Sequence, residues 1–179
     1  MTDGARQQNV IQFSADYEPE IARWVWAFED TRRRTKQTLS GLQPAHVDWT
    51  PSLERANIGS QLYHIAAIEV DYLHADILQA NFTPEVEALF SHNVRDAEGR
   101  LTLLTNLPLA DHVRRLDTVR AIFLSSLRGM SIAEFRRARR MSDYDVTPEW
   151  VIHHLMQHEA EHRAGIAALR ADAERKRAL

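Results

Sequence analysis

The chain has no cysteine, and this absence sets the first limits on its chemistry. Disulfide bonds, thiolate metal sites and a cysteine nucleophile are all excluded. Long apolar runs are also missing, because no stretch approaches the roughly 20 residues that a membrane-spanning helix needs. The N-terminal stretch MTDGARQQNV lacks the apolar centre of a signal peptide. We therefore expect a soluble, cytoplasmic protein with no membrane partner.

An excess of basic charge is lacking as well. The formal net charge is -3 at pH 7, whereas nonspecific affinity for nucleic acid depends mainly on clustered excess cations. We expect no nucleic-acid partner. With 179 residues, 44% of them hydrophobic and 26% charged, the chain suits one globular domain of ordinary size. We predict a single domain over residues 1–179, with a flexible N-terminal segment over residues 1–15.

Strands are not predicted, because no segment shows a convincing alternation of apolar and polar residues. Apolar residues instead recur at helical spacing in four segments, which cover approximately residues 16–40, 58–79, 109–129 and 148–175. Two long connections join them, residues 80–108 with a short helix near 85–90, and residues 131–146. The pattern predicts an all-α four-helix bundle.

Two of the nine histidines lie on the apolar face of the last predicted helix. At about 100° per residue, with Trp150 at zero, the apolar side chains span an arc from about 100° to about 160°. His158 and His162 fall at about 80° and about 120°, one turn apart, whereas His153 points away. Two histidines at positions i and i+4 can bind one metal ion, each through one ring nitrogen.

A third ligand has to come from another helix, because His154 lies two turns, or about 12 Å, from His162 along the axis. In the second predicted helix His64 falls at the edge of the apolar arc. His74 falls on the polar side, where we expect it to be solvated. This reasoning selects His64, His158 and His162 as one metal site. The alternative is that all three are buried histidines whose hydrogen bonds are satisfied without a metal.

Glu159 gives residues 158–162 the form HExxH, in which the glutamate of a zinc peptidase is the general base. We set this interpretation aside, because the extended pattern needs a histidine at the position of Ala168, and no strand is predicted to hold a peptide substrate. We expect instead that Glu159 or Asp71 accepts a hydrogen bond from the outer N–H group of a ligand imidazole.

A family resemblance is carried by three stretches, LSGLQPAHVDWTPS, ANIGSQLYHIAAIEVDYL with His64, and YDVTPEWVIHHLMQHEAEHRAGIAALR with His158 and His162. Together they resemble the DinB/YfiT-like family of metal-binding four-helix bundles. The resemblance implies that the three histidines bind a divalent transition metal, usually zinc or nickel. The chain departs from the family at residues 163–166, where Arg-Ala-Gly-Ile replaces the usual Arg-Gly-Gln-Ile. We do not expect this departure to touch the ligands.

Three nitrogen ligands leave one position of a metal open, as in catalytic zinc sites, and such a metal can lower the pKa of a thiol or a water. The resemblance implies a low-molecular-weight-thiol S-transferase with a small-molecule substrate, and the thiol would be a cosubstrate because the chain has no cysteine. Two alternatives stay open: a hydrolase that uses metal-activated water, and a non-catalytic bundle that binds a metal or small ligand. Members of this family often form homodimers through helices of the bundle, so the resemblance also allows a homodimer. The substrate, the thiol and the metal are not identified by the sequence.

The sequence also contains two groups of basic residues. The first, Arg32, Arg33, Arg34 and Lys36, forms a run on a predicted helix, which usually indicates a solvated face. The second contains the four arginines between residues 136 and 140, in the connection before the last helix. It could face an anionic cosubstrate at the end of the bundle or be ordinary surface charge.

Overall fold

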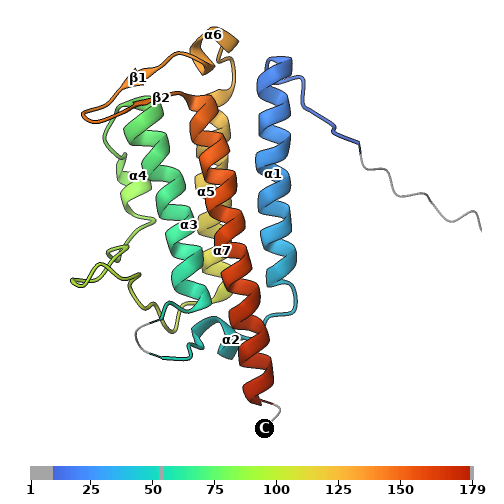
Figure 1. Cartoon of the computed structure of the whole chain (residues 1–179), viewed down its shortest axis with the longest axis vertical. Coiled ribbons are helices and arrows are strands. Elements are labelled where there is room, and N and C mark those ends of the chain that lie inside the picture. Colours follow the sequence, from blue (N-terminus) through green and yellow to red (C-terminus); the bar gives the residue numbers. More distant parts are fainter. Residues whose placement is uncertain (1–9, 53–54, 178–179) are drawn as a thin grey trace, which may run out of the picture.

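Four long helices, α1, α3, α5 and α7, dominate the computed structural model, which describes residues 10–52 and 55–177 (Figure 1). In chain order the elements are α1 (Pro19–Leu39), α2 (Pro44–Asp48), α3 (Ile58–Tyr72), η1 (Leu73–Leu78), α4 (Pro84–Glu87), α5 (Leu109–Leu127), α6 (Ile132–Phe135), β1 (Arg139–Arg140), β2 (Asp145–Val146) and α7 (Pro148–Arg177). Most of the N-terminal segment expected to be flexible, residues 1–9, lies outside the described residues. Among the described residues, no helix is long and apolar enough to cross a membrane.

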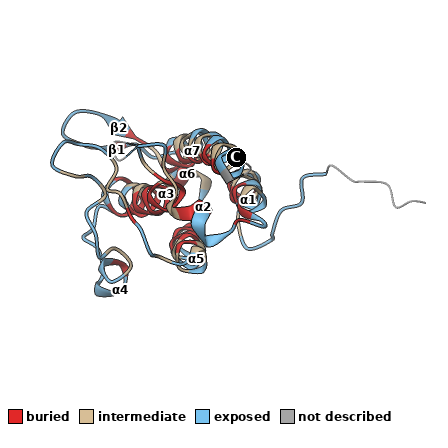
Figure 2. Ribbon diagram, turned by 90° about the horizontal axis from the view of Figure 1, so that it is seen from below, coloured by how far each residue is buried: buried red, intermediate tan, exposed pale blue. Residues whose placement is uncertain are grey.

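The four long helices form a ring whose buried residues face a common core (Figure 2). Around the ring, α1 packs beside α7, α7 beside α3, and α3 beside α5. Helices α1 and α7 run in one direction, and α3 and α5 run in the other (Figure 1). Because α3 and α5 are parallel neighbours, the chain must return along the bundle between them, which explains the long connection that contains α4. The predicted all-α four-helix bundle is confirmed, and β1 and β2 add only a small antiparallel pair.

Local sequence determines where the site-bearing helix α3 begins and ends. The side chain of Asn57 accepts a hydrogen bond from the backbone N–H of Ser60 at 2.7 Å and so caps its N-terminus. The helix predicted over residues 58–79 is not continuous, since α-helical hydrogen bonding ends at Tyr72 and a π-helical turn, η1, follows. Such turns often occur next to functional sites. The helical run then stops at Gln79, which has a φ of 50°.

The centre of the bundle contains four charged side chains, one from each long helix. Arg32 donates to Glu69 at 2.6 Å and to Glu159 at 2.8 Å. Arg120 donates to the same two carboxylates at 2.7 Å and 3.1 Å. All four side chains are at most 4% exposed, and both guanidinium groups also donate to backbone carbonyl groups. We call these residues the four-helix ion cluster. Its charges balance, as buried ions require.

Two predictions about solvated side chains were wrong. Arg32 does not belong to a solvated basic face, because it lies in the four-helix ion cluster, whereas Arg33 and Arg34 pair with Asp30 nearer the surface. His74 is buried in η1, where it packs edge-on against Phe82. The connection after η1 covers its ring, since Nδ1 of His74 also lies 3.1 Å from the carbonyl oxygen of Asn81.

The second basic group is used largely within the protein. Arg139 is buried and pairs with Glu134 at 2.5 Å. Arg136 pairs with Glu20 of α1 at 2.5 Å and with Glu149 of α7 at 3.3 Å. These ion pairs connect the segment before α7 to the neighbouring helices. They argue against a free anion-binding surface at this end of the bundle.

Candidate metal centre

The three histidines selected from the sequence lie together where α3 faces α7. His64 comes from α3, and His158 and His162 come from successive turns of α7. The Nε2 atoms of His64 and His158 are 3.1 Å apart, and one ring nitrogen from each of the three residues lies within 4.8 Å of the others. Within residues 10–52 and 55–177, no other group of three or more His, Cys, Asp or Glu side chains meets the spacing of a metal site.

Burial keeps the three imidazole rings uncharged, which is the state in which they can bind a metal. Burial, followed by the effects of His158 and His162, lowers the pKa of His64 to about 3. Burial and the neighbouring His162 lower the pKa of His158 to about 4. The pKa of His162 is also below its ordinary value, mainly because of burial. At neutral pH each ring is therefore uncharged and retains a nitrogen lone pair for a ligand bond.

The geometry of the donors fits a transition metal. Two nitrogens bound to one ion at about 2.0–2.1 Å in tetrahedral geometry would lie about 3.3 Å apart. The observed separation of 3.1 Å between the Nε2 atoms of His64 and His158 is close to this value. The three side chains could hold one metal ion.

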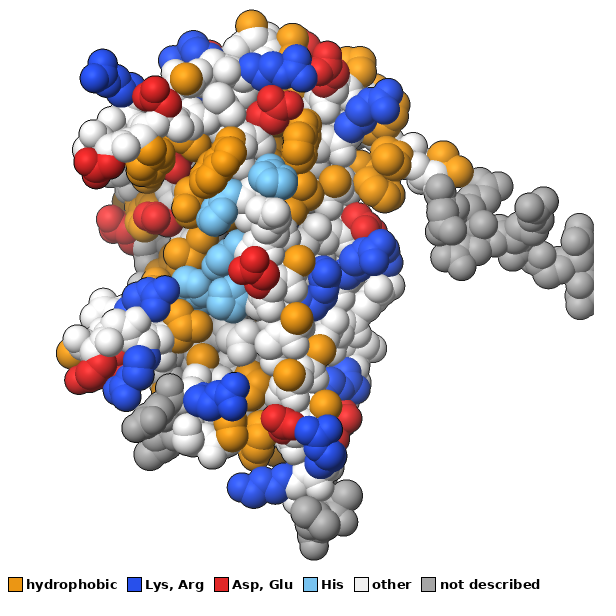
Figure 3. All heavy atoms as spheres, viewed as in Figure 1, with side chains coloured by type: hydrophobic (Ala, Val, Ile, Leu, Met, Phe, Trp, Pro, Cys, Tyr) orange, Lys and Arg blue, Asp and Glu red, His pale blue; other side chains and the backbone are white. Residues whose placement is uncertain are grey.

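The site opens on one face of the molecule. Figure 3 shows a column of histidine side chains over α3 and α7, flanked by hydrophobic side chains. His154 continues the series on α7, but its ring stacks on Trp150 at a centroid distance of 5.0 Å and lies 4.9 Å from Tyr72. His154 is thus held by aromatic contacts outside the three-histidine group, as its spacing predicted. His158 and His162 are only partly buried, so the group can be reached from solvent.

Gln61, which the sequence reasoning missed, supports one of the histidines. Its Oε1 atom lies 3.4 Å from Nδ1 of His162. An acceptor at this position favours a proton on Nδ1 and leaves Nε2 free for a metal. Gln61 also packs against Gly165, where an added Cβ would come within 2.9 Å of the same Oε1. Gly165, which belongs to the departure from the family pattern over residues 163–166, thus contacts Gln61, and Gln61 contacts His162. We had not expected this departure to lie so close to a ligand.

Glu159 is turned away from the histidines, so the expectation that it supports a ligand imidazole was wrong. Its carboxylate accepts hydrogen bonds from Arg32 and Arg120 in the four-helix ion cluster. Burial alone would raise the pKa of Glu159, but the two guanidinium groups outweigh it and hold the pKa below its ordinary value. An ionised carboxylate locked in the core cannot be the general base of an HExxH peptidase. Asp71 has no hydrogen bond to these histidines in the described structure either.

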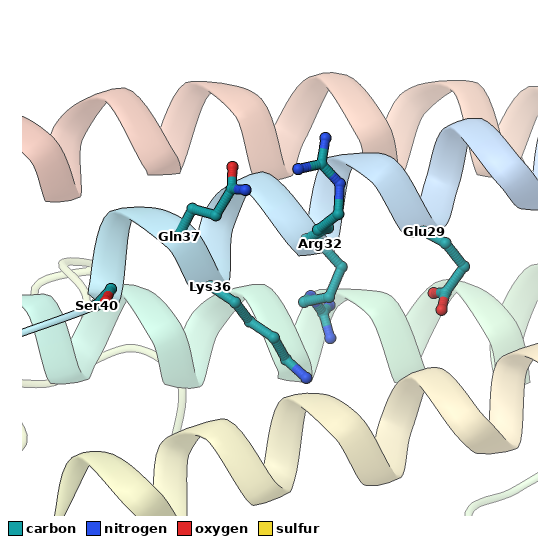
Figure 4. Close-up of a pocket in the computed structure, with 6 residues that line it drawn as sticks. Glu29, Arg32, Lys36, Gln37 and Ser40 are labelled. Carbon is teal, nitrogen blue, oxygen red and sulfur yellow. The ribbon is translucent and has the colours of Figure 1, made fainter. Parts of the chain in front are cut away.

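A separate groove runs along α1 and is lined by Glu29, Arg32, Arg33, Lys36, Gln37 and Ser40 (Figure 4). Its charged groups already have protein partners. Lys36 pairs with Asp117 at 2.6 Å, and Glu29 pairs with Arg120 at 3.0 Å. Because these charges already have partners, the groove is a weaker candidate for a reactive site than the three histidines.

Known proteins share both the sequence pattern and the fold of this chain. The sequence profile of the DinB superfamily matches residues 27–166. A crystal structure described as that of the conserved protein of locus from Enterococcus faecalis has a TM-score of 0.65 and 12% sequence identity, over 82% of this chain and 92% of that chain. At this identity the likeness concerns the fold alone. No curated protein matches the chain.

Proposed function

The chain belongs to the DinB superfamily, and on this basis we propose that His64, His158 and His162 bind one divalent transition metal, zinc or nickel, in a thiol S-transferase site. The observation that carries the proposal is the convergence of three uncharged imidazoles from two helices on one point at an accessible face. A metal with three nitrogen ligands and an open position supplies Lewis acidity that lowers the pKa of a thiol or a water. The protein's own residues would fix the ligand geometry, and the Oε1 atom of Gln61 favours the His162 tautomer with its proton on Nδ1.

Thiol transfer at this site would need a low-molecular-weight cosubstrate that brings the thiol to a small electrophilic substrate, because the chain has no cysteine. One feature argues against the alternative of an HExxH hydrolase. A hydrolase of the HExxH type needs a carboxylate base beside the metal, and Glu159 is committed to Arg32 and Arg120. A metal-dependent hydrolase with a different base and a non-catalytic metal-binding bundle are the remaining candidates.

The test is a measurement of metal content and of thiol transfer on the same samples. We expect about one equivalent of transition metal in tag-free protein purified without chelator, and its loss in His158→Ala. The matched control is His153→Ala on the same helix, whose exposed side chain lies outside the three-histidine group and should leave the metal in place. Metal-loaded protein should consume a generic electrophile only in the presence of a thiol.

Each outcome of this test separates the candidate functions. Turnover of esters or amides without any thiol would favour the hydrolase. Bound metal without turnover by any of several thiols would favour the non-catalytic bundle. Native protein that stays free of metal after addition of zinc or nickel would contradict all three candidates, and the histidines would then be core residues.

Replacement of Gly165 by alanine should have two opposite effects. Removing a helix-interior glycine should stabilise α7 by up to about 1 kcal/mol. The new Cβ would displace Gln61 and weaken its contact with His162, which should lower metal affinity by about tenfold. Urea unfolding and a competitive metal titration measure the two effects. Gln61→Ala should lower metal affinity by a similar factor, and the double variant should lose no more than either single one.

A further inference from the structure

A cavity of about 410 Å³ lies between α3 and the long connection that follows η1. Its lining is mostly apolar, with one acidic and one basic residue: Ala67, Ile68, Val70, Asp71, Phe82, Phe90, Val94 and Arg95. This volume lies within the range of small-molecule sites in proteins, in which apolar walls bury the ligand and a few polar groups orient it. None of these residues belongs to the three-histidine group.

The cavity adjoins the three histidines along α3. Ile68 and Asp71 follow His64 at positions i+4 and i+7, so the wall of the cavity continues the helix face that carries the ligand. Arg95, in the connection, also lies near the histidines. After the larger effect of burial, the charge of its guanidinium contributes to lowering the pKa of both His64 and His162. In Figure 3, basic side chains lie beside the histidine column on the side of this connection. A molecule in the cavity would therefore lie next to the histidines.

The two charged residues of the cavity are not paired with each other or with another charge in the described structure. Arg95 donates one hydrogen bond, to the backbone carbonyl of Gly99 at 2.7 Å, and has further N–H donors available. Asp71 has no hydrogen bond or ion pair among the described residues, and partial burial raises the pKa of its carboxyl. Both residues expose much of their surface to solvent, so a ligand can approach them. A ligand with charges of its own could pair with both side chains.

We propose that this cavity binds an amino-acid-like zwitterion with an apolar body, whose carboxylate pairs with Arg95 and whose ammonium group pairs with Asp71. The walls formed by Ile68, Phe82 and Phe90 would cover the apolar part. A ligand with only one charge is disfavoured, because it would leave the other protein charge unpaired or face it with the same sign. The inference deepens the proposed function by giving the substrate class of that site, and its biological role rests on that function.

The test is calorimetric titration of the full chain near neutral pH with three probes that share one body. L-phenylalanine carries both charges, its amide lacks the carboxylate, and 3-phenylpropanoate lacks the ammonium group. We expect phenylalanine to bind about tenfold more tightly than either other probe. Arg95→Gln should lower affinity for phenylalanine about tenfold while leaving that for the amide nearly unchanged. Asp71→Asn should lower affinity for phenylalanine and leave that for 3-phenylpropanoate nearly unchanged or improved.

Arg114→Gln is the matched control, since it removes the same charge from an exposed side chain outside the cavity lining and should change no affinity. The inference is overturned if 3-phenylpropanoate binds as tightly as phenylalanine, if Arg95→Gln has no effect, or if no probe binds. Repeating the titrations with His158→Ala and without metal separates this inference from the proposed function. Phenylalanine binding by a native chain that takes up no zinc or nickel would support the cavity and contradict the proposed function, and metal binding without phenylalanine binding would do the reverse.

Discussion

Arg120→Ala should lower the free energy of unfolding by about 3–5 kcal/mol, a large fraction of the stability of a domain of this size. Arg120 is almost fully buried in the four-helix ion cluster and neutralises Glu69 and Glu159. Its guanidinium also lies over the ring of Phe28, at 3.3 Å from the ring centre. Removal of the cation would leave two carboxylates in the core with Arg32 as their one remaining partner within the cluster.

The size of this effect follows from the asymmetry of buried ion pairs. An intact buried pair adds little net stability, because its attraction mainly offsets the loss of hydration. A broken pair keeps the desolvation cost of the remaining charge without the attraction. The loss expected for Arg120→Ala therefore reports the penalty on Glu69 and Glu159. Arg120→Lys should be less destabilising, since it keeps the charge but not the planar set of N–H donors.

Urea unfolding at neutral pH measures these differences. The control is Arg114→Ala on the same helix, where an exposed pair with Asp111 should contribute at most about 1 kcal/mol. If Arg120→Ala fails to fold, Arg120→Lys still tests the cluster through its smaller loss. A change in unfolding free energy below about 1 kcal/mol for Arg120→Ala would contradict the view that the cluster is a tightly coupled core feature.

Zinc should raise the free energy of unfolding by about 4 kcal/mol when its free concentration is 1,000 times its dissociation constant. The reason is linkage, because the three ring nitrogens are brought within 4.8 Å of each other only in the folded chain. His64→Ala should abolish most of this increase.

Thermal unfolding with and without zinc measures this second effect. His112→Ala is the matched control, because His112 is equally buried but lies against Gly59 and outside the three-histidine group. It should destabilise the protein while keeping the full zinc-dependent increase. An equal zinc effect in the native chain and in His64→Ala would show that stabilisation does not arise at the three histidines.

The sequence by itself determined the fold class and the faces of the helices. Apolar periodicity predicted four long helices whose ends the structure places within a few residues, and a bundle is the way to bury four such faces. The same periodicity selected His64, His158 and His162, which the structure brings together. The same periodicity also indicated that two charged residues of the four-helix ion cluster are buried, which we did not predict. Arg32 follows Ile21 by 11 residues and Glu69 follows Ile58 by 11 residues. Each therefore lies about 20° from that apolar residue, on the same face of its helix.

Only the tertiary structure decided which side chains meet across helices. Periodicity gives the direction of a residue around its own helix, but contacts such as Gln61 with His162 depend on how α3 and α7 are shifted along and rotated about their axes. His74 is buried because the connection after η1 covers its ring with Phe82 and places the carbonyl group of Asn81 beside it, a long-range contact that periodicity does not predict. Arg95 sits in an irregular connection without periodicity, so only the path of the folded chain could bring it beside the histidines. Local spacing thus determines which face of its helix a residue occupies, and the packing of the folded chain determines which residues it contacts.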